Sequence, residues 1–152
     1  HIGSDEAWLL STSRWVEAFV PITHTHFAGI YITSIYAKAN ADNNLLFEAA
    51  LRFAASRGDV PYFICLDANE DVANSTTWQA AFATGWWHHV AEGSSDETLP
   101  TYCNALDWDR SSHVPGATRI DFIIANNRMA PAIVKCYVDD SSNYPTHRPI
   151  CI

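Results

Sequence analysis

The chain has 152 residues, of which 48% are hydrophobic and 17% charged, and this composition predicts a single soluble globular domain. No run of residues approaches the ~20 apolar positions of a membrane-spanning helix, and the polar residues 1–6 do not have the pattern of a signal peptide. The formal net charge of −8 argues against a generally basic nucleic-acid-binding surface, although a divalent cation can supply positive charge where a phosphate is bound.

The cysteines indicate a redox environment rather than a metal site. None of them has the spacing of a metal-binding motif, and two lie in apolar, strand-like runs, where a buried free thiol is the usual interpretation and a disulfide the alternative. We therefore expect a reducing, intracellular compartment, either the cytoplasm or the nucleus. The four residues are Cys65, Cys103, Cys136 and Cys151.

The first predicted elements form a hairpin. Residues 1–13 are a polar lead segment in which we predict no helix or strand. Residues 14–20 alternate in polarity and residues 27–36 are rich in β-branched and aromatic side chains, so we expect two antiparallel strands.

A helix is predicted next, because the hydrophobic period changes after the hairpin. Asp42 or Asn43 can cap this helix, which runs to about Arg57 and is ended by Gly58. Its apolar face consists of Leu46, Ala49, Ala50, Phe53 and Ala54.

The remaining elements follow from the same signals. A second helix begins at Asn74 or Ser75, runs to about Thr84 and is ended by Gly85. Further strands are predicted at residues 61–66, 101–103, 119–125 and 132–138. The sequence therefore predicts one α/β unit in which strands outnumber helices.

Two acidic residues lie in or just after apolar strands. Asp67 and Asn69 follow the strand at residues 61–66 and would point to the same side; an ordinary Asx turn is the alternative to a functional role. Asp121 lies inside an apolar strand, where a carboxylate is costly unless it is paired, so an ion pair with Arg119 or Arg148 is its structural alternative.

Other polar and aromatic residues mean little by themselves. His147 lies in a tight turn between two prolines, and a histidine with a purely structural role is commoner than a catalytic one. Tyr36 closes a strand and would by default be a core aromatic residue. His24 and His26 could contribute to a zinc site, but no third ligand accompanies them.

In their order along the chain, these pieces resemble the endonuclease/exonuclease/phosphatase superfamily. The resemblance rests on Tyr36-Ala37, Leu66-Asp67-Ala68-Asn69, Thr101-Tyr102, Arg119-Ile120-Asp121-Phe122-Ile123 and Thr146-His147-Arg148-Pro149. It covers about residues 14–152 and implies the C-terminal portion of a deoxyribonuclease-like domain, which is a two-sheet sandwich of mixed, mostly antiparallel strands flanked by helices. Roughly 80 to 100 residues of such a domain would have no counterpart in this chain.

The resemblance implies a role for each matching residue. Asp67 would orient or deprotonate the attacking water, and Asn69 would help to hold the scissile phosphate. Asp121 would orient His147, which would stabilise the charge that develops on the phosphate. Tyr36 would lie near the phosphate.

The resemblance also implies a divalent cation, Mg²⁺ or Mn²⁺, with Asp67, Asn69 and Thr146 as its ligands. Thr146 stands where the family has an aspartate, and a threonine hydroxyl is a poor ligand for a hard cation, so we expect reduced metal affinity. The glutamate ligand of the family has no counterpart, because neither Glu6 nor Glu17 has the right context.

The expected function is that of a metal-dependent phosphoester hydrolase of the phosphodiesterase or endonuclease type. Its substrate would be a phosphate ester, with DNA as one candidate, and a retrotransposon-type endonuclease is slightly favoured over a lipid phosphatase. We expect weak or no activity from the chain alone. The alternative is a non-catalytic remnant or partner-binding module of the same fold, with Trp86 and Trp87 as a candidate interface. Nothing in the sequence indicates the oligomeric state.

Overall fold

The computed structural model describes residues 2–22, 28–94, 97–103, 117–139 and 146–152. The helices are α1 (Ile2–Ser11), α2 (Asn44–Ser56) and α3 (Thr76–Ala83), with short 3-10 turns η1 (Val72–Asn74) and η2 (Ala130–Ala132). The strands are β1 (Trp15–Pro21), β2 (Gly29–Tyr36), β3 (Tyr62–Asp67), β4 (Trp87–His89), β5 (Asp121–Asn126), β6 (Tyr137–Val138) and β7 (Ile150–Cys151).

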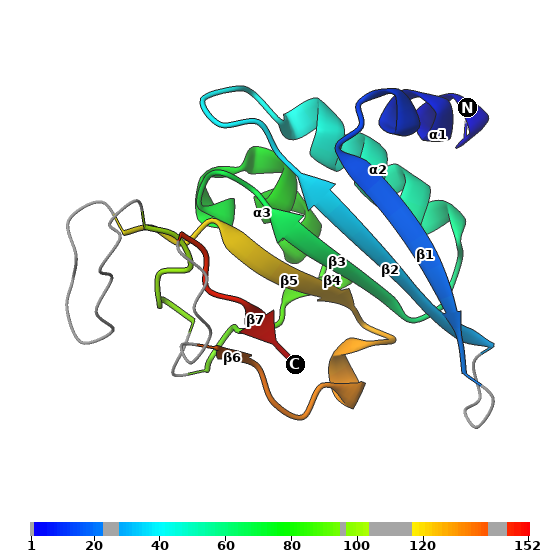
Figure 1. Ribbon diagram of the computed structural model, residues 1–152. Helices are drawn as coiled ribbons and strands as arrows, with labels where there is room; N and C mark the ends of the chain where they lie inside the picture. Colours follow the sequence, from blue (N-terminus) through cyan, green and yellow to red (C-terminus); the bar gives the residue numbers. More distant parts are fainter. Residues whose placement is uncertain (1, 23–27, 95–96, 104–116, 140–145) are drawn as a thin grey trace.

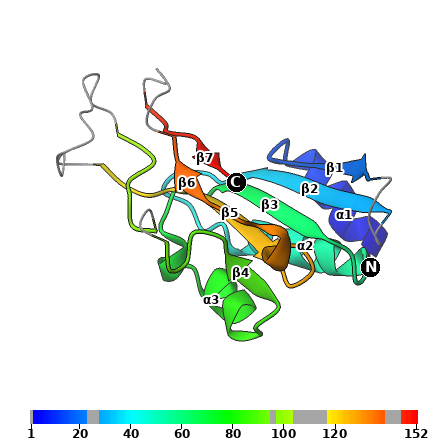
Figure 2. The same cartoon turned by 90° about the horizontal axis from the view of Figure 1, so that it is seen from below.

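The strands form two sheets, as expected for a sandwich. The larger sheet has the order β1-β2-β3-β5-β4, in which only β2 and β3 run parallel, while β6 and β7 form a small antiparallel sheet (Figure 1). Seen edge-on, the larger sheet has α2 and α3 on one face and β6–β7 on the other (Figure 2). The predicted α/β class and the mixed, mostly antiparallel strand directions are confirmed.

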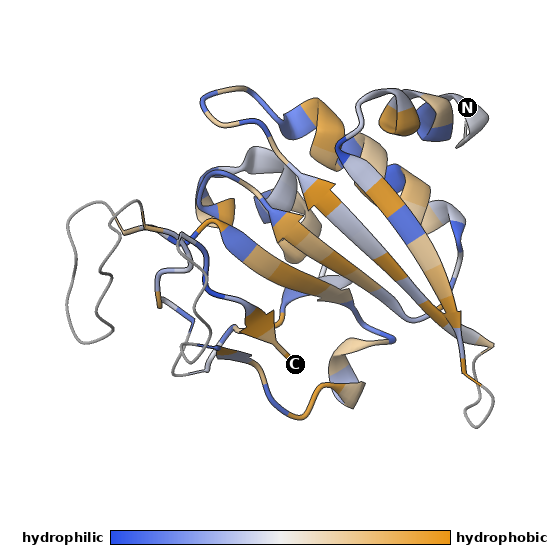
Figure 3. Cartoon of the chain, in the orientation of Figure 1, coloured by the Kyte–Doolittle hydropathy of each residue, from blue (hydrophilic) through white to orange (hydrophobic). Residues whose placement is uncertain are grey.

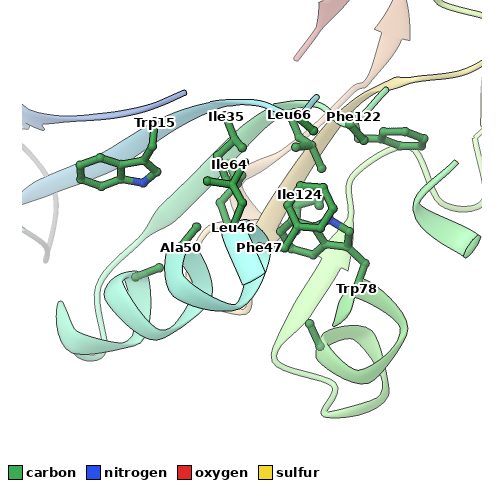
Figure 4. Close-up of a cluster of buried hydrophobic side chains, with 14 of the residues drawn as sticks. Trp15, Ile35, Leu46, Phe47, Ala50, Ile64, Leu66, Trp78, Phe122 and Ile124 are labelled. Atoms are coloured by element: carbon green, nitrogen blue, oxygen red, sulfur yellow. The ribbon is translucent and has the colours of Figure 1, made fainter. Parts of the chain in front are cut away.

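The main core lies between the larger sheet and the helices. Every residue of the predicted apolar face of α2 is buried. Ile35, Ile64 and Ile124 come from three neighbouring strands and meet Phe47 of α2 and Trp78 of α3 (Figure 4). Colouring by hydropathy shows apolar residues concentrated along the central strands (Figure 3). Burial of this surface stabilises the layer that carries the strand ends.

A charged network is buried at the outer part of this layer. Glu17 of β1 accepts hydrogen bonds from Arg57 Nε and Nη2, at 2.9 and 2.5 Å, and from the hydroxyl of Tyr62. The Glu17 side chain is only 6% exposed, and the Arg57 guanidinium lies 4.4 Å from the centroid of the Phe53 ring. Glu17 is therefore fully engaged as a structural residue.

Some predicted boundaries differ from the structure. Residues 2–11, within the polar lead, form α1, which packs on α2 and buries Leu9 completely. The strand expected at 132–138 is reduced to β6, because the segment around Pro131 turns instead, with Ala132 N donating to Met129 O. Residues 87–89, for which no strand was predicted, form β4, which pairs with β5.

The four cysteines all lie within the described residues and form no disulfide. Cys103 is buried, whereas Cys65 of β3 is exposed on the sheet face opposite the helices, so its expected burial is wrong. Within the described ranges, no helix is long and apolar enough to cross a membrane.

Candidate active site

Three neighbouring strands bring polar side chains together at one end of the larger sheet. Tyr36 ends β2 and is the register partner of Asp67, which ends β3, and Asp67 in turn faces Asp121 at the start of β5. Their sequence neighbours Leu66 and Phe122 point into the helix-side core, so these three side chains share the opposite face. In Figure 1 this end of the sheet lies beside the red C-terminal segment.

Asp121 pairs with His147. The imidazole Nδ1 lies 3.0 Å from Asp121 Oδ2, and the two side chains are 41% and 23% exposed for His147 and Asp121. Because an ionised carboxylate can only accept, Nδ1 is the donor in this bond, which leaves Nε2 for another partner. Arg119, which the sequence offered as a structural partner, donates instead to the carbonyl of Leu99, at 3.1 Å.

The carboxyl group of Asp67 has a perturbed pKa. Burial raises its pKa above the ordinary value, and the negative charge of Asp121 raises it further. Asn69 N donates to Asp67 Oδ1 at 3.2 Å, which is the Asx turn that the sequence left open. This hydrogen bond uses only Oδ1 of Asp67, so Oδ2 can still take part in a functional contact.

The side chain of Asn69 is turned toward the end of β2. Its backbone φ is +52°, in the left-handed region that asparagine tolerates, and its Nδ2 donates to the carbonyl of Ala37 at 2.7 Å. The buried Ala37 and Ala68 allow the strand ends to lie close together: Ala37 N donates to Asp67 O at 2.8 Å.

A cleft of about 400 Å³ contains four of the predicted site residues. Tyr36, Asp67, Asp121 and His147 line it. Tyr36 is 55% exposed, so it is not a core aromatic residue. Asn69 and Thr146 belong to the same strand ends and turn but are not among the lining residues.

The charged groups of this cleft fit a divalent cation. Ligand atoms of Asp67, Asp121 and His147 all lie within 4.8 Å of one another. Two facing carboxylates supply the oxygen donors that Mg²⁺ and Mn²⁺ prefer, and an imidazole suits Mn²⁺ better than Mg²⁺. Glu17 cannot contribute, because it lies on the helix side of the sheet and is paired with Arg57.

Two site contacts were not predicted from the sequence. The buried hydroxyl of Thr101 accepts a hydrogen bond from Asp121 N at 3.0 Å, and the ring of Tyr102 lies 5.0 Å from that of His147. The sequence identifies Thr101-Tyr102 only through the family resemblance, because contacts between residues so far apart in the chain leave no periodic signal. His24 and His26 lie outside the described residues.

Comparison with known proteins supports the fold. No protein-family model and no curated protein match the sequence. Among solved structures, an endonuclease/exonuclease/phosphatase family protein from Bacteroides thetaiotaomicron matches with a TM-score of 0.57 at 14% identity, over 90% of this chain and 54% of its own. The endonuclease domain of TRAS1, a telomere-specific non-LTR retrotransposon, matches with a TM-score of 0.65 at 17% identity, over 90% of this chain and 61% of its own.

The catalytic domain of APE2 from Xenopus laevis matches with a TM-score of 0.59 at 14% identity, over 97% of this chain and 57% of its own. The resemblance to this superfamily is thus confirmed for the fold. The chain spans a little more than half the length of these three solved structures.

Proposed function

We propose that this chain, which has the fold of endonuclease/exonuclease/phosphatase proteins, is part of a metal-dependent phosphoester hydrolase of the phosphodiesterase or endonuclease type. The observation that carries the proposal is the grouping of Asp67, Asp121 and His147 in one cleft. An acid–histidine pair facing a second, partly buried acid is the equipment needed to direct water at a phosphate.

The two carboxylates would have different roles. Burial raises the pKa of Asp67, which makes it a better acceptor for the proton of an attacking water. Asp121 holds the Nδ1–H of His147, so the imidazole Nε2 is the atom that can donate to a phosphate oxygen once the ring is protonated. The ring would then stabilise the negative charge of the pentacovalent transition state.

Mg²⁺ or Mn²⁺ would neutralise the charge of the phosphate and of the departing oxygen when bound. From the resemblance we propose Asp67, Asn69 and Thr146 as ligands, and the geometry adds Asp121 and His147 as groups within reach. Asn69 donates through Nδ2 to Ala37, so Oδ1 is the atom that can accept or coordinate.

We propose nucleic acid as the substrate class, with DNA first. Two of the matched structures are an endonuclease domain of a retrotransposon and the APE2 catalytic domain, which favours a phosphodiester over a small phosphomonoester. The net charge of −8 predicts weak binding in the absence of a divalent cation. The chain alone would have low activity, because Thr146 replaces a carboxylate at the proposed metal site.

For the alternative of a non-catalytic module, the sequence offered Trp86 and Trp87 as a candidate interface. Trp87 is only 7% exposed and packs edge-on against Tyr62, so this pair is largely part of the core. The structure therefore gives this alternative less support than the grouped acids and histidine give to the hydrolase.

The test is divalent-ion binding combined with hydrolysis of supercoiled plasmid DNA. Mn²⁺ and Mg²⁺ should raise the melting temperature of the protein, and Asp67→Ala should reduce both this shift and any nicking. Glu92→Gln removes an exposed carboxylate outside the cleft and serves as the control. Absence of an ion-dependent shift and of nicking would favour the non-catalytic module, whereas strong nicking by the chain alone would contradict its expected low activity.

A further inference from the structure

We infer that Thr101 and Tyr102 are positioning residues that hold the Asp121–His147 pair in one geometry, with the Tyr102 ring fixing the imidazole. The inference rests on the proposed function of that pair. Its geometry, however, can be measured whether or not the chain is active.

The backbone of Tyr102 connects the two segments that carry the pair. Tyr102 forms antiparallel bridges with both Thr118, just before β5, and His147. Tyr102 N donates to Thr118 O and Thr118 N donates to Tyr102 O, both at 2.9 Å. The acid and the histidine are 26 positions apart in sequence, and this short segment joins the two backbone segments that carry them.

The flanking residues secure the same connection on the histidine side. Cys103 N donates to Thr146 O at 3.0 Å, and Arg148 N donates to Thr101 O at 2.8 Å. Both backbone neighbours of His147 are therefore tied to residues 101–103. These bonds limit how far the imidazole can move away from β5.

The side chain of Thr101 secures the acid. Its hydroxyl oxygen accepts hydrogen bonds from Asp121 N at 3.0 Å and from Ile120 N at 3.2 Å, and Thr101 is completely buried. A hydroxyl has two acceptor lone pairs, so it can serve both donors. The start of β5, and with it the carboxylate of Asp121, is thus fixed from the same segment.

The ring of Tyr102 acts on the imidazole itself. Its centroid is 5.0 Å from that of His147, with an interplanar angle of 59°, which is a tilted aromatic contact. A rotation of His147 about χ2 would take Nδ1 away from Asp121 and would move the edge of the imidazole past the neighbouring Tyr102 ring. Tyr102 therefore selects the rotamer in which Nδ1–H meets the carboxylate, and with it the Nδ1–H tautomer.

The experiment is long-range ¹H–¹⁵N NMR of the histidine side chains of the whole chain, recorded for neutral imidazole. The signals of His147 are identified from their loss in His147→Gln. We expect a single Nδ1–H tautomer in the wild type and in Tyr102→Phe, and a mixture of both tautomers in Tyr102→Leu. Tyr137→Leu, which removes a partly exposed tyrosine from β6, should leave the tautomer unchanged.

If Tyr102→Leu does not fold, as judged by circular dichroism, Tyr102→Met supplies an apolar side chain of similar length and takes its place. Where hydrolysis is measurable, loss of the ring should lower kcat about 10-fold with little change in KM, because substrate binding is not affected.

An unchanged tautomer in Tyr102→Leu or Tyr102→Met would overturn the inference. So would an equal loss in Tyr102→Phe, since the hydroxyl rather than the ring would then be responsible. A tautomer mixture in a chain that hydrolyses nothing would support the positioning role and count against the proposed function alone.

Discussion

Asp67 and Asp121 face each other directly across the antiparallel strands β3 and β5. Two carboxylates in register on one face of a sheet repel each other, and like charges in this arrangement destabilise a sheet. The chain keeps both, one with a raised pKa and the other hydrogen-bonded to His147. Functional sites often keep residues that reduce the stability of the fold, as these two carboxylates do.

The first prediction is that Asp67→Asn stabilises the protein. Asparagine has a similar shape, can still accept from Asn69 N through Oδ1, and removes the repulsion with Asp121. We expect the free energy of unfolding at pH 7 to rise by about 0.2–1 kcal/mol, measured by urea denaturation.

This gain should depend on pH. A carboxyl whose folded-state pKa is raised stabilises the fold when it is protonated, and this contribution is lost as the pH rises through the folded-state pKa. The advantage of Asp67→Asn should therefore be small below about pH 4 and fully present at pH 7. A lower free energy of unfolding of the variant at pH 7 would show that Asp67 and Asp121 do not repel each other in the folded protein.

The second prediction concerns the divalent cation. Saturating Mn²⁺ should raise the free energy of unfolding of the wild type by about 2.7 kcal/mol at 100 times the Kd. Asp67→Asn and Asp121→Asn should lose most of this stabilisation.

Thr146→Asp should tighten binding of Mn²⁺ and Mg²⁺ in isothermal titration calorimetry, because it adds a hard oxygen ligand. An unchanged or weaker affinity in Thr146→Asp would remove Thr146 from the proposed ligand set.

The third prediction is that Asp121 and His147 act as a unit. Asp121→Asn should lower kcat about 10²–10⁴-fold, because the imidazole loses its fixed tautomer and its stabilising charge. His147→Gln should have a similar effect, and the double variant should be little worse than either single one. Additive losses in plasmid nicking would show that the two residues act independently.

Most residues of the candidate site could be predicted from the sequence, but only when several short motifs were considered together. Asp121 stands out because a carboxylate within an apolar strand needs a partner, whereas its true partner, His147, comes 26 positions later and is chosen by the fold rather than by spacing. Tyr36 and Asp67 were predicted at strand ends, and the parallel register of β2 and β3 explains why they are neighbours. Hydrophobic periodicity identified the buried face of α2 because the residues of that face pack into the main core.

Other elements depend on contacts that periodicity does not record. Helix α1 has a weakly amphipathic sequence and becomes a helix by docking Leu9 on α2 and pairing Asp5 with Arg52 at 3.1 Å. The strand β4 has three residues and is defined by its pairing with β5. Glu17 reads as an ordinary alternating strand residue, yet it is the centre of a buried network.

The fourth prediction follows from that network. Glu17→Ala should lower the free energy of unfolding by about 3 kcal/mol, because it leaves the Arg57 guanidinium without its carboxylate and the Tyr62 hydroxyl with only its hydrogen bond to Thr33 Oγ1. The control is Glu48→Ala, which removes an exposed i,i+4 pair with Arg52 and should cost at most about 0.5 kcal/mol. Equal costs for the two variants, measured by urea denaturation, would show that the network around Glu17 contributes no more than a surface pair.

The fifth prediction is a loss of stability in mild acid that originates at His89. Burial, together with the positive charge of Arg119, lowers the pKa of His89 to about 4, and its Nε2 is buried with no hydrogen-bond partner in the part of the chain that the structure describes. A histidine whose folded-state pKa is depressed is neutral in the folded protein. The unfolded chain therefore binds the proton first, below about pH 6.5, and stability is lost as the pH falls from there toward 4.

With allowance for partial exposure, we expect this residue to account for roughly 2 kcal/mol of the loss between pH 7 and pH 4. His89→Phe should remove that share, because a phenyl ring keeps the edge-on contact with Phe122 and has no proton to bind. His88→Phe is the matched control, because it places the same phenyl ring at the neighbouring position of β4, where the imidazole Nε2 contacts Asn127 Oδ1. Carboxylates titrate in the same range, and the comparison of the two variants isolates the histidine. If both variants lose stability in acid as steeply as the wild type, the buried imidazole is not the source of the acid sensitivity.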